Sequence, residues 1–255
     1  MKMYLNKFEL HEDYVDFMSD EDEYITPNVS VCVDKNEVHY NPFDPHEYVD
    51  LGLPSGALWA TENIKDSDGN ELYFAWGETE GYTDDQVTGS TTPHKNFNWS
   101  DYKYGTSFNN LTKYNSTDGK TVLDSEDDAA TVNWGKNWKM PTKALFEELV
   151  ENTTSGWTTD GKTGITFTSN NGNTLFFPAV GFADYGEVYG VGDWGYYWSS
   201  SLRGGAVYRA WDLSFGSDEY DINGDDRCYG QSVRPVRLYN NSGTTLQDPI
   251  IQAEL

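Results

Sequence analysis

The sequence predicts an α+β domain in which two short helices precede a series of short antiparallel strands joined by long loops. Two helical segments with capping residues lie between residues 125 and 151. From Thr163 onward, apolar residues alternate with polar ones, as they do in strands that bury one face. Aromatic residues make up 15% of the 255-residue chain, which also holds 24 glycines, so we expect a core of rings and many turns.

Both helices are predicted from their ends as well as from their apolar spacing. Ser125, followed three residues later by Asp128, resembles a capping box, and Gly135 suits the left-handed position that closes a helix ending at Trp134. The second helix runs from Thr142 to Glu151. Its inward face consists of Leu145, Phe146, Leu149 and Val150.

The strands follow the helices. Thr163–Ser169 and Thr174–Val180 flank Asn170–Asn173, whose Asn-Gly pair is the strongest short hairpin signal. We also expect a strand and turn from Tyr48 to Ala60. Three further strands are predicted at Tyr196–Ser201, Val207–Phe215 and Gln231–Leu238. Before the helices, the polar stretch from Lys65 to Thr121 is a long loop with dispersed rings, and loops of that length are usually functional or pinned by their own side chains.

Three regions are expected along the chain: an attachment arm at 1–47, a binding domain at 48–239 and a tail at 240–255. The arm is acidic and contains a predicted hairpin of Val29–Val33 and Glu37–Tyr40, with Pro42 and Pro45 marking its end. Because this segment is short and highly charged, it cannot bury enough surface to fold alone. We therefore expect it to dock on the domain or on another protein.

A formal charge of −25 excludes nucleic acid as a partner, because phosphate binding depends on Lys and Arg, and it disfavours an anionic membrane surface. No window approaches the ~18 apolar residues of a spanning helix, and the first residues lack the apolar core of an export signal. We therefore expect a protein made in the cytoplasm. Cys32 and Cys228 lie far apart and form no zinc or redox motif.

Seven sequence blocks occur in a recognisable order: Val49–Gly56, Leu58–Ala60, Tyr73–Thr79, Asp127–Ala130, Trp138–Thr142, Tyr196–Ser201 and Gly230–Val236. Together they resemble the Fibrobacter succinogenes major paralogous domain of Bacteroidetes and Fibrobacter surface proteins. That family looks like a branch of the formylglycine-generating-enzyme type of C-type-lectin fold, and the resemblance implies a loop-rich ligand face.

The segment Thr26–Pro42 resembles an attachment stretch of Bacteroides phage proteins, including those of crAss-like phages. Together with the lack of an export signal, this resemblance implies a virion component such as a head, collar or tail fibre protein. Its arm would contact other virion proteins, and its domain would adhere to a host or gut glycan or surface protein. We expect a homo-oligomer, because such arms commonly mediate assembly. The alternative is a bacterial surface or secreted glycan-binding adhesin.

Enzymatic activity is not expected. Formylglycine-generating enzymes use a copper-binding pair of cysteines, whereas the second half of this chain holds Cys228 alone. We interpret Cys228 as a small buried hydrophobic residue. No histidine lies in a recognisable nucleophile motif. Asp221–Asp226 has the alternating oxygens of a calcium loop, but Ser232 stands where the bidentate Glu belongs, which excludes an EF-hand. A plain turn is favoured there over a looser calcium site, so no cofactor is expected.

Ligand contact is predicted for the rings and arginines between Tyr185 and Arg227. Tyr and Trp provide large contact areas at low entropy cost, and Arg adds bidentate polar contacts. By contrast, the tryptophans within strand or helix blocks are expected in the core: Trp59, Trp76, Trp138, Trp198 and Trp211. The predicted ligand-binding residues are Tyr185, Tyr189, Trp194, Tyr196, Arg203, Tyr208, Arg209, Tyr220 and Arg227.

Overall fold

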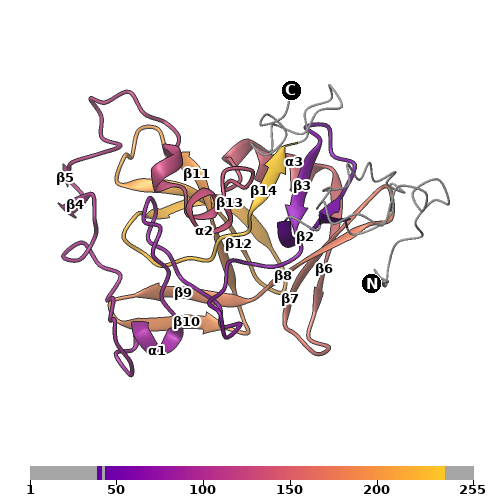
Figure 1. The fold of residues 1–255 in the computed structure, drawn as a ribbon, viewed down its shortest axis with the longest axis horizontal. Coiled ribbons are helices and arrows are strands. Elements are labelled where there is room, and N and C mark those ends of the chain that lie inside the picture. Colours follow the sequence, from indigo (N-terminus) through magenta and orange to yellow (C-terminus); the bar gives the residue numbers. More distant parts are fainter. Residues whose placement is uncertain (1–38, 42–43, 239–255) are drawn as a thin grey trace, which may run out of the picture. The chain divides into compact units, whose positions relative to one another are not determined.

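A computed structural model describes residues 39–41 and 44–238. These residues form a β-rich α+β fold with few helices, as the sequence predicted at this coarse level (Figure 1). The predicted strand Val29–Val33 and the tail at 240–255 lie outside the described residues.

A four-stranded sheet joins the beginning of the described chain to its end. Its order is β1 (His39–Asn41), β2 (Asp44–Asp50), β3 (Ala57–Ala60) and β14 (Val236–Leu238), with antiparallel pairing throughout. Figure 1 shows β3 and β14 side by side. This sheet includes residues 44–47, so it begins before the predicted start of the domain at Tyr48.

The helices lie where their patterns indicated. The 3₁₀ turn η2 (Ser125–Asp127) leads into α2 (Ala129–Trp134), and α3 spans Lys143–Glu151. The cap of α2 is Asp128 rather than Ser125: its carboxylate accepts a hydrogen bond from the Thr131 amide at 2.9 Å. In the long loop before them lie α1 (Asp84–Val87), β4 (Gly105–Ser107) and β5 (Asn110–Leu111).

Two further sheets complete the domain. In the first, β7 (Gly164–Ser169) pairs with β8 (Thr174–Pro178) as the predicted hairpin, and β6 (Thr153–Thr158) adds a strand that was not predicted. The second sheet has the order β10-β9-β11-β12-β13. Its strands are β9 (Val180–Asp184), β10 (Glu187–Val191), β11 (Gly195–Leu202), β12 (Arg209–Phe215) and β13 (Tyr220–Asp226).

The prediction for Asp221–Asp226 was wrong. These residues are neither a turn nor a calcium loop but most of β13, paired in continuous register with β12 from Tyr220 opposite Phe215 to Asp226 opposite Arg209. The acidic composition hides the strand because its apolar partners lie on β12, which supplies the buried side chains Leu213 and Phe215.

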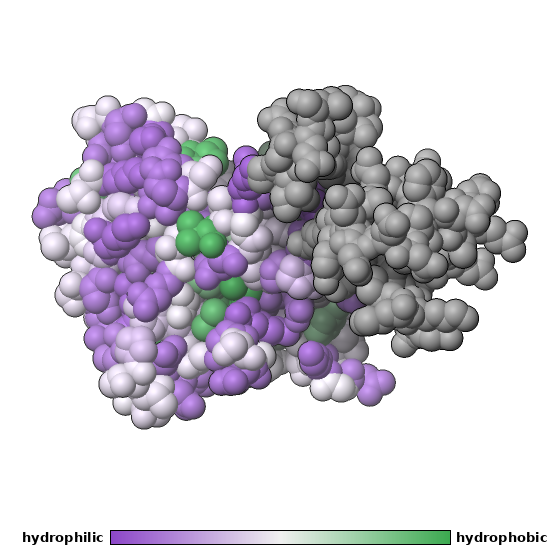
Figure 2. All heavy atoms as spheres, viewed as in Figure 1, coloured by the Kyte–Doolittle hydropathy of each residue, from purple (hydrophilic) through white to green (hydrophobic). Residues whose placement is uncertain are grey.

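Rings dominate the core, which divides into two clusters of buried side chains. Trp59 lies in one cluster, and the second holds Trp76, Trp138 and Trp198; all four are fully buried as predicted. Trp211 is partly exposed, because the Lys143 ammonium and the Arg203 guanidinium cover its ring instead of apolar side chains. The surface seen in Figure 2 is largely hydrophilic, with small hydrophobic patches.

Candidate ligand-binding surface

The end of the β12–β13 hairpin carries a shallow pocket of about 190 Å³, referred to below as the Trp194 pocket. Trp194 precedes β11, while Ser214 and Asp221 lie opposite each other on β12 and β13. Two predicted ligand residues, Trp194 and Tyr220, therefore meet in one concave site. The lining consists of Trp194, Ser214, Phe215, Glu219, Tyr220 and Asp221.

Glycines place two rings of this pocket, Trp194 and Phe215. A Cβ atom on Gly216 would come within 3.0 Å of the Trp194 ring, and one on Gly195 would come within 2.2 Å of the Phe215 ring. Each ring therefore lies directly over backbone that only glycine leaves clear. Any larger residue at Gly195 must displace Phe215, a buried core ring, so the pocket wall depends on this pairing of ring and glycine.

Beside the pocket, three rings gather around Phe182 of β9. The ring centroids of Tyr189, Tyr196 and Tyr229 lie 5.6, 4.8 and 6.0 Å from that of Phe182. Tyr196 also pairs with Ser214 in the β11–β12 register, so this ring group continues into the Trp194 pocket. The predicted residues Tyr189 and Tyr196 thus belong to the same surface as Trp194.

Tyr185 stands apart at the tip of the β9–β10 hairpin. Its φ of 47° and that of Gly186, 78°, are both positive, as the two central residues of a type I′ turn require. A tyrosine in this conformation is uncommon, and its ring is 69% exposed. Next to it, burial and then the neighbouring Asp226 raise the pKa of Asp184 to about 6.

Three predicted residues lie at the opposite end of β12 and interact within the protein. The Arg209 Nε donates to Asp226 at 3.1 Å, and its guanidinium lies over the Tyr208 ring. Tyr208 also meets the Phe108 ring, with centroids 5.8 Å apart. Arg203 lies over Trp211 and donates to the Gly224 carbonyl at 3.3 Å. These side chains are partly exposed but are separated from the Trp194 pocket along the strand.

Arg227 was wrongly predicted as a ligand residue, since it is fully buried. Its guanidinium donates to the Tyr102 hydroxyl and to the backbone carbonyls of Lys113, Tyr114 and Val207, at 2.9 to 3.0 Å. The Cζ atom of the Arg227 guanidinium also lies 4.9 Å from the centroid of the Trp76 ring. These contacts tie the long loop to β13, so the role of Arg227 is structural.

Two acids lie on the same sheet face as Tyr196: Asp212 of β12, which is buried, and Asp225 of β13, which is half-buried. Gln231 donates to both carboxyl groups, at 2.9 and 3.0 Å. Burial, and then the proximity of Asp225, raises the pKa of Asp212 well above its usual range; burial also raises the pKa of Asp225. Burial and the neighbouring carboxyl group therefore favour the protonated form of Asp212.

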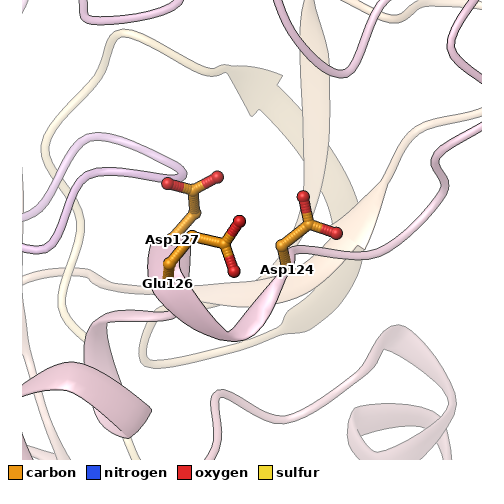
Figure 3. A group of neighbouring side chains, drawn as sticks. All are labelled: Asp124, Glu126 and Asp127. Atoms are coloured by element: carbon orange, nitrogen blue, oxygen red, sulfur yellow. The ribbon is translucent and has the colours of Figure 1, made fainter.

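Asp124, Glu126 and Asp127 form the group of acids, among the described residues, that could hold a metal ion; their carboxylate oxygens lie within 4.8 Å of one another (Figure 3). Lysines already neutralise this group: Lys113 contacts all three acids, and Lys103 contacts Asp127. Burial raises the pKa of Asp127, but hydrogen bonds from Lys113, Tyr104 and Tyr114 outweigh that effect and lower the pKa to about 2.

The remaining sequence candidates are structural. Cys228 is buried, and burial raises the pKa of its thiol, as expected for a small hydrophobe. Sequence reasoning did not single out the following as ligand residues: Phe182, Ser214, Phe215, Glu219, Asp221 and Tyr229. The three rings among them, Phe182, Phe215 and Tyr229, carried a usable signal, since each stands beside a glycine.

No family model, curated protein or solved structure matches this chain. Within the described residues, no helix is long and apolar enough to cross a membrane.

Proposed function

We propose that this chain is a non-enzymatic recognition module with a C-type-lectin-like domain, which binds a glycan of a host-cell or gut surface through the Trp194 pocket. The observation that carries the proposal is the meeting of Trp194 and Tyr220 with Ser214 and two carboxylates in one concave site. Rings stack on the apolar faces of sugars, while hydroxyls and carboxylates accept hydrogen bonds from sugar hydroxyls.

The size of the pocket supports a small recognition unit. At about 190 Å³ it is smaller than the roughly 300–1,000 Å³ typical of drug-sized ligands, so it suits one sugar ring of a longer chain. The adjoining ring group of Phe182, Tyr189, Tyr196 and Tyr229 offers a surface along which neighbouring sugars can stack. The affinity would therefore come from several weak contacts, and repetition of the domain in an oligomer would raise it.

Glycan-array binding tests the proposal, with Trp194→Ala as the variant. We expect a loss of about 2 kcal/mol, or roughly thirtyfold in affinity, because the ring is the largest contact surface of the pocket. Tyr208→Ala is the matched control, since it removes a partly exposed ring at the other end of β12. Equal binding by the wild type and Trp194→Ala would exclude this pocket as the site.

The setting that we propose is a Bacteroides phage particle, in which residues 1–47 attach the domain to other virion proteins and mediate homo-oligomerisation. Its support is the resemblance of Thr26–Pro42 to phage attachment segments. Mass spectrometry of purified particles tests it, with detection of the intact chain as the expected result. Labelling of the protein on intact, uninfected bacterial cells would instead support the alternative, a bacterial surface adhesin.

A further inference from the structure

The charged groups in the Trp194 pocket are all of one sign. Glu219 and Asp221 line it, and no lysine or arginine does. Neither side-chain carboxylate has a hydrogen-bond or ion-pair partner in the part of the chain that the structure describes. Their backbone carbonyls accept instead, that of Asp221 from the Ser214 hydroxyl and that of Glu219 from the Gly216 amide. By contrast, Asp127 is bound by two lysines and two tyrosines, and Asp226 by Arg209.

A ring accompanies these two carboxylates. Trp194 is 39% exposed, so it presents ring surface to solvent at the pocket. A ring face attracts a cation through its quadrupole, and Trp is the strongest of the three aromatic residues in this respect. Carboxylates beside ring faces therefore form a site in which an ammonium group gains both attractions, whereas a carboxylate or sulfate of a ligand meets repulsion from both acids.

We propose that the Trp194 pocket selects a glycan unit that carries a free ammonium group, as in a 2-amino-2-deoxy sugar, over the same unit with its amine acetylated. This selectivity rests on the proposed glycan-binding function and adds the identity of the recognised group. The sugar ring lies against Trp194, and the ammonium donates to the carboxylates of Glu219 and Asp221. The Ser214 hydroxyl, which donates to the Asp221 backbone carbonyl at 3.5 Å, accepts a hydrogen bond from a sugar hydroxyl.

Calorimetry with two oligosaccharides of equal length tests the selectivity: one of β-1,4-linked glucosamine, the other its fully N-acetylated form. We expect the glucosamine oligomer to bind at least tenfold more tightly at low salt, and the preference to shrink as salt rises. In Glu219→Gln/Asp221→Asn the preference should disappear. Asp68→Asn/Asp118→Asn is the control, since it removes two exposed acids outside the pocket and leaves the net charge equal.

Each outcome discriminates. Equal affinity for the two oligomers, or tighter binding of the acetylated one, overturns the ammonium proposal while the glycan function stands. A preference that survives Glu219→Gln/Asp221→Asn but falls in the control double variant shows general charge attraction and also overturns it. Failure to bind the glucosamine oligomer, with array glycans still bound through Trp194, overturns the selectivity alone. Loss of all array binding counts against the proposed function itself.

Discussion

Replacing Arg227 by methionine keeps most of the side chain's volume and removes its guanidinium. Four hydrogen bonds are lost, and three of them leave buried backbone carbonyls, at Lys113, Tyr114 and Val207, without this donor. Hydrogen bonds to charged groups contribute about 1.5–3 kcal/mol each, and an unsatisfied buried acceptor costs about 1–3 kcal/mol. Because such losses are not additive, we expect Arg227→Met to lower the free energy of unfolding by at least about 4 kcal/mol.

Urea unfolding followed by tryptophan fluorescence measures this loss, and limited proteolysis locates it. Cleavage should increase first near Lys113, because Arg227 joins that loop to the sheet. Arg209→Met is the matched control: its guanidinium is partly exposed and forms one ion pair, with Asp226, so we expect a loss of no more than about 1 kcal/mol. If Arg227→Met unfolds within about 1 kcal/mol of the wild type yet binds ligand poorly, the structural role is refuted.

Two further predictions concern the acids. The free energy of unfolding of the wild type should fall as the pH rises above about 4, because folded Asp212 keeps a proton that the unfolded chain releases. Chemical denaturation at several pH values should show a weaker pH dependence of this free energy for Asp212→Asn, and a higher value at pH 8. The same pH dependence in both proteins would contradict the proton on Asp212. Millimolar Ca²⁺ should leave the Tm unchanged, because Lys113 already neutralises the acids around Asp127. A saturable rise of the Tm with Ca²⁺ that Glu126→Gln abolishes would refute this.

The parts of the fold that the sequence could predict are those with local causes. Thr142 caps α3 by accepting from the Leu145 amide, and the Asn-Gly turn closes the β7–β8 hairpin, each through neighbours within a few residues. The cap of α2 was misplaced because Asp128 is held by more than its own helix. Its carboxylate also accepts from the Met140 amide, twelve residues away, a contact that no local pattern reveals.

The same distinction explains the site. The exposure of Trp194 could be anticipated, because a ring beside a glycine in a loop tends to be exposed, and that depends on local sequence. Arg227 has glycine and tyrosine neighbours too, yet its partners Tyr102 and Lys113 lie 125 and 114 positions away. Glu219 was indistinguishable from the many other acids of a chain with formal charge −25 until the fold placed it beside Trp194.

The sequence contains five arginines, and each lies against an aromatic ring of its own domain. Arg203 lies over Trp211, Arg209 over Tyr208 and Arg227 over Trp76. Arg234 lies over Phe177, and Arg237 over Tyr48 and Trp138.

These contacts determine the polarity of the proposed ligand surface. Guanidinium groups are the side chains best suited to bind carboxylates and sulfates of a ligand, and here they are held in internal contacts. The acids Glu219 and Asp221 remain at the pocket without such partners among the described residues. A domain that uses its guanidinium groups to order its own rings therefore keeps a ligand face of rings and carboxylates, which favours neutral and cationic ligands over acidic ones.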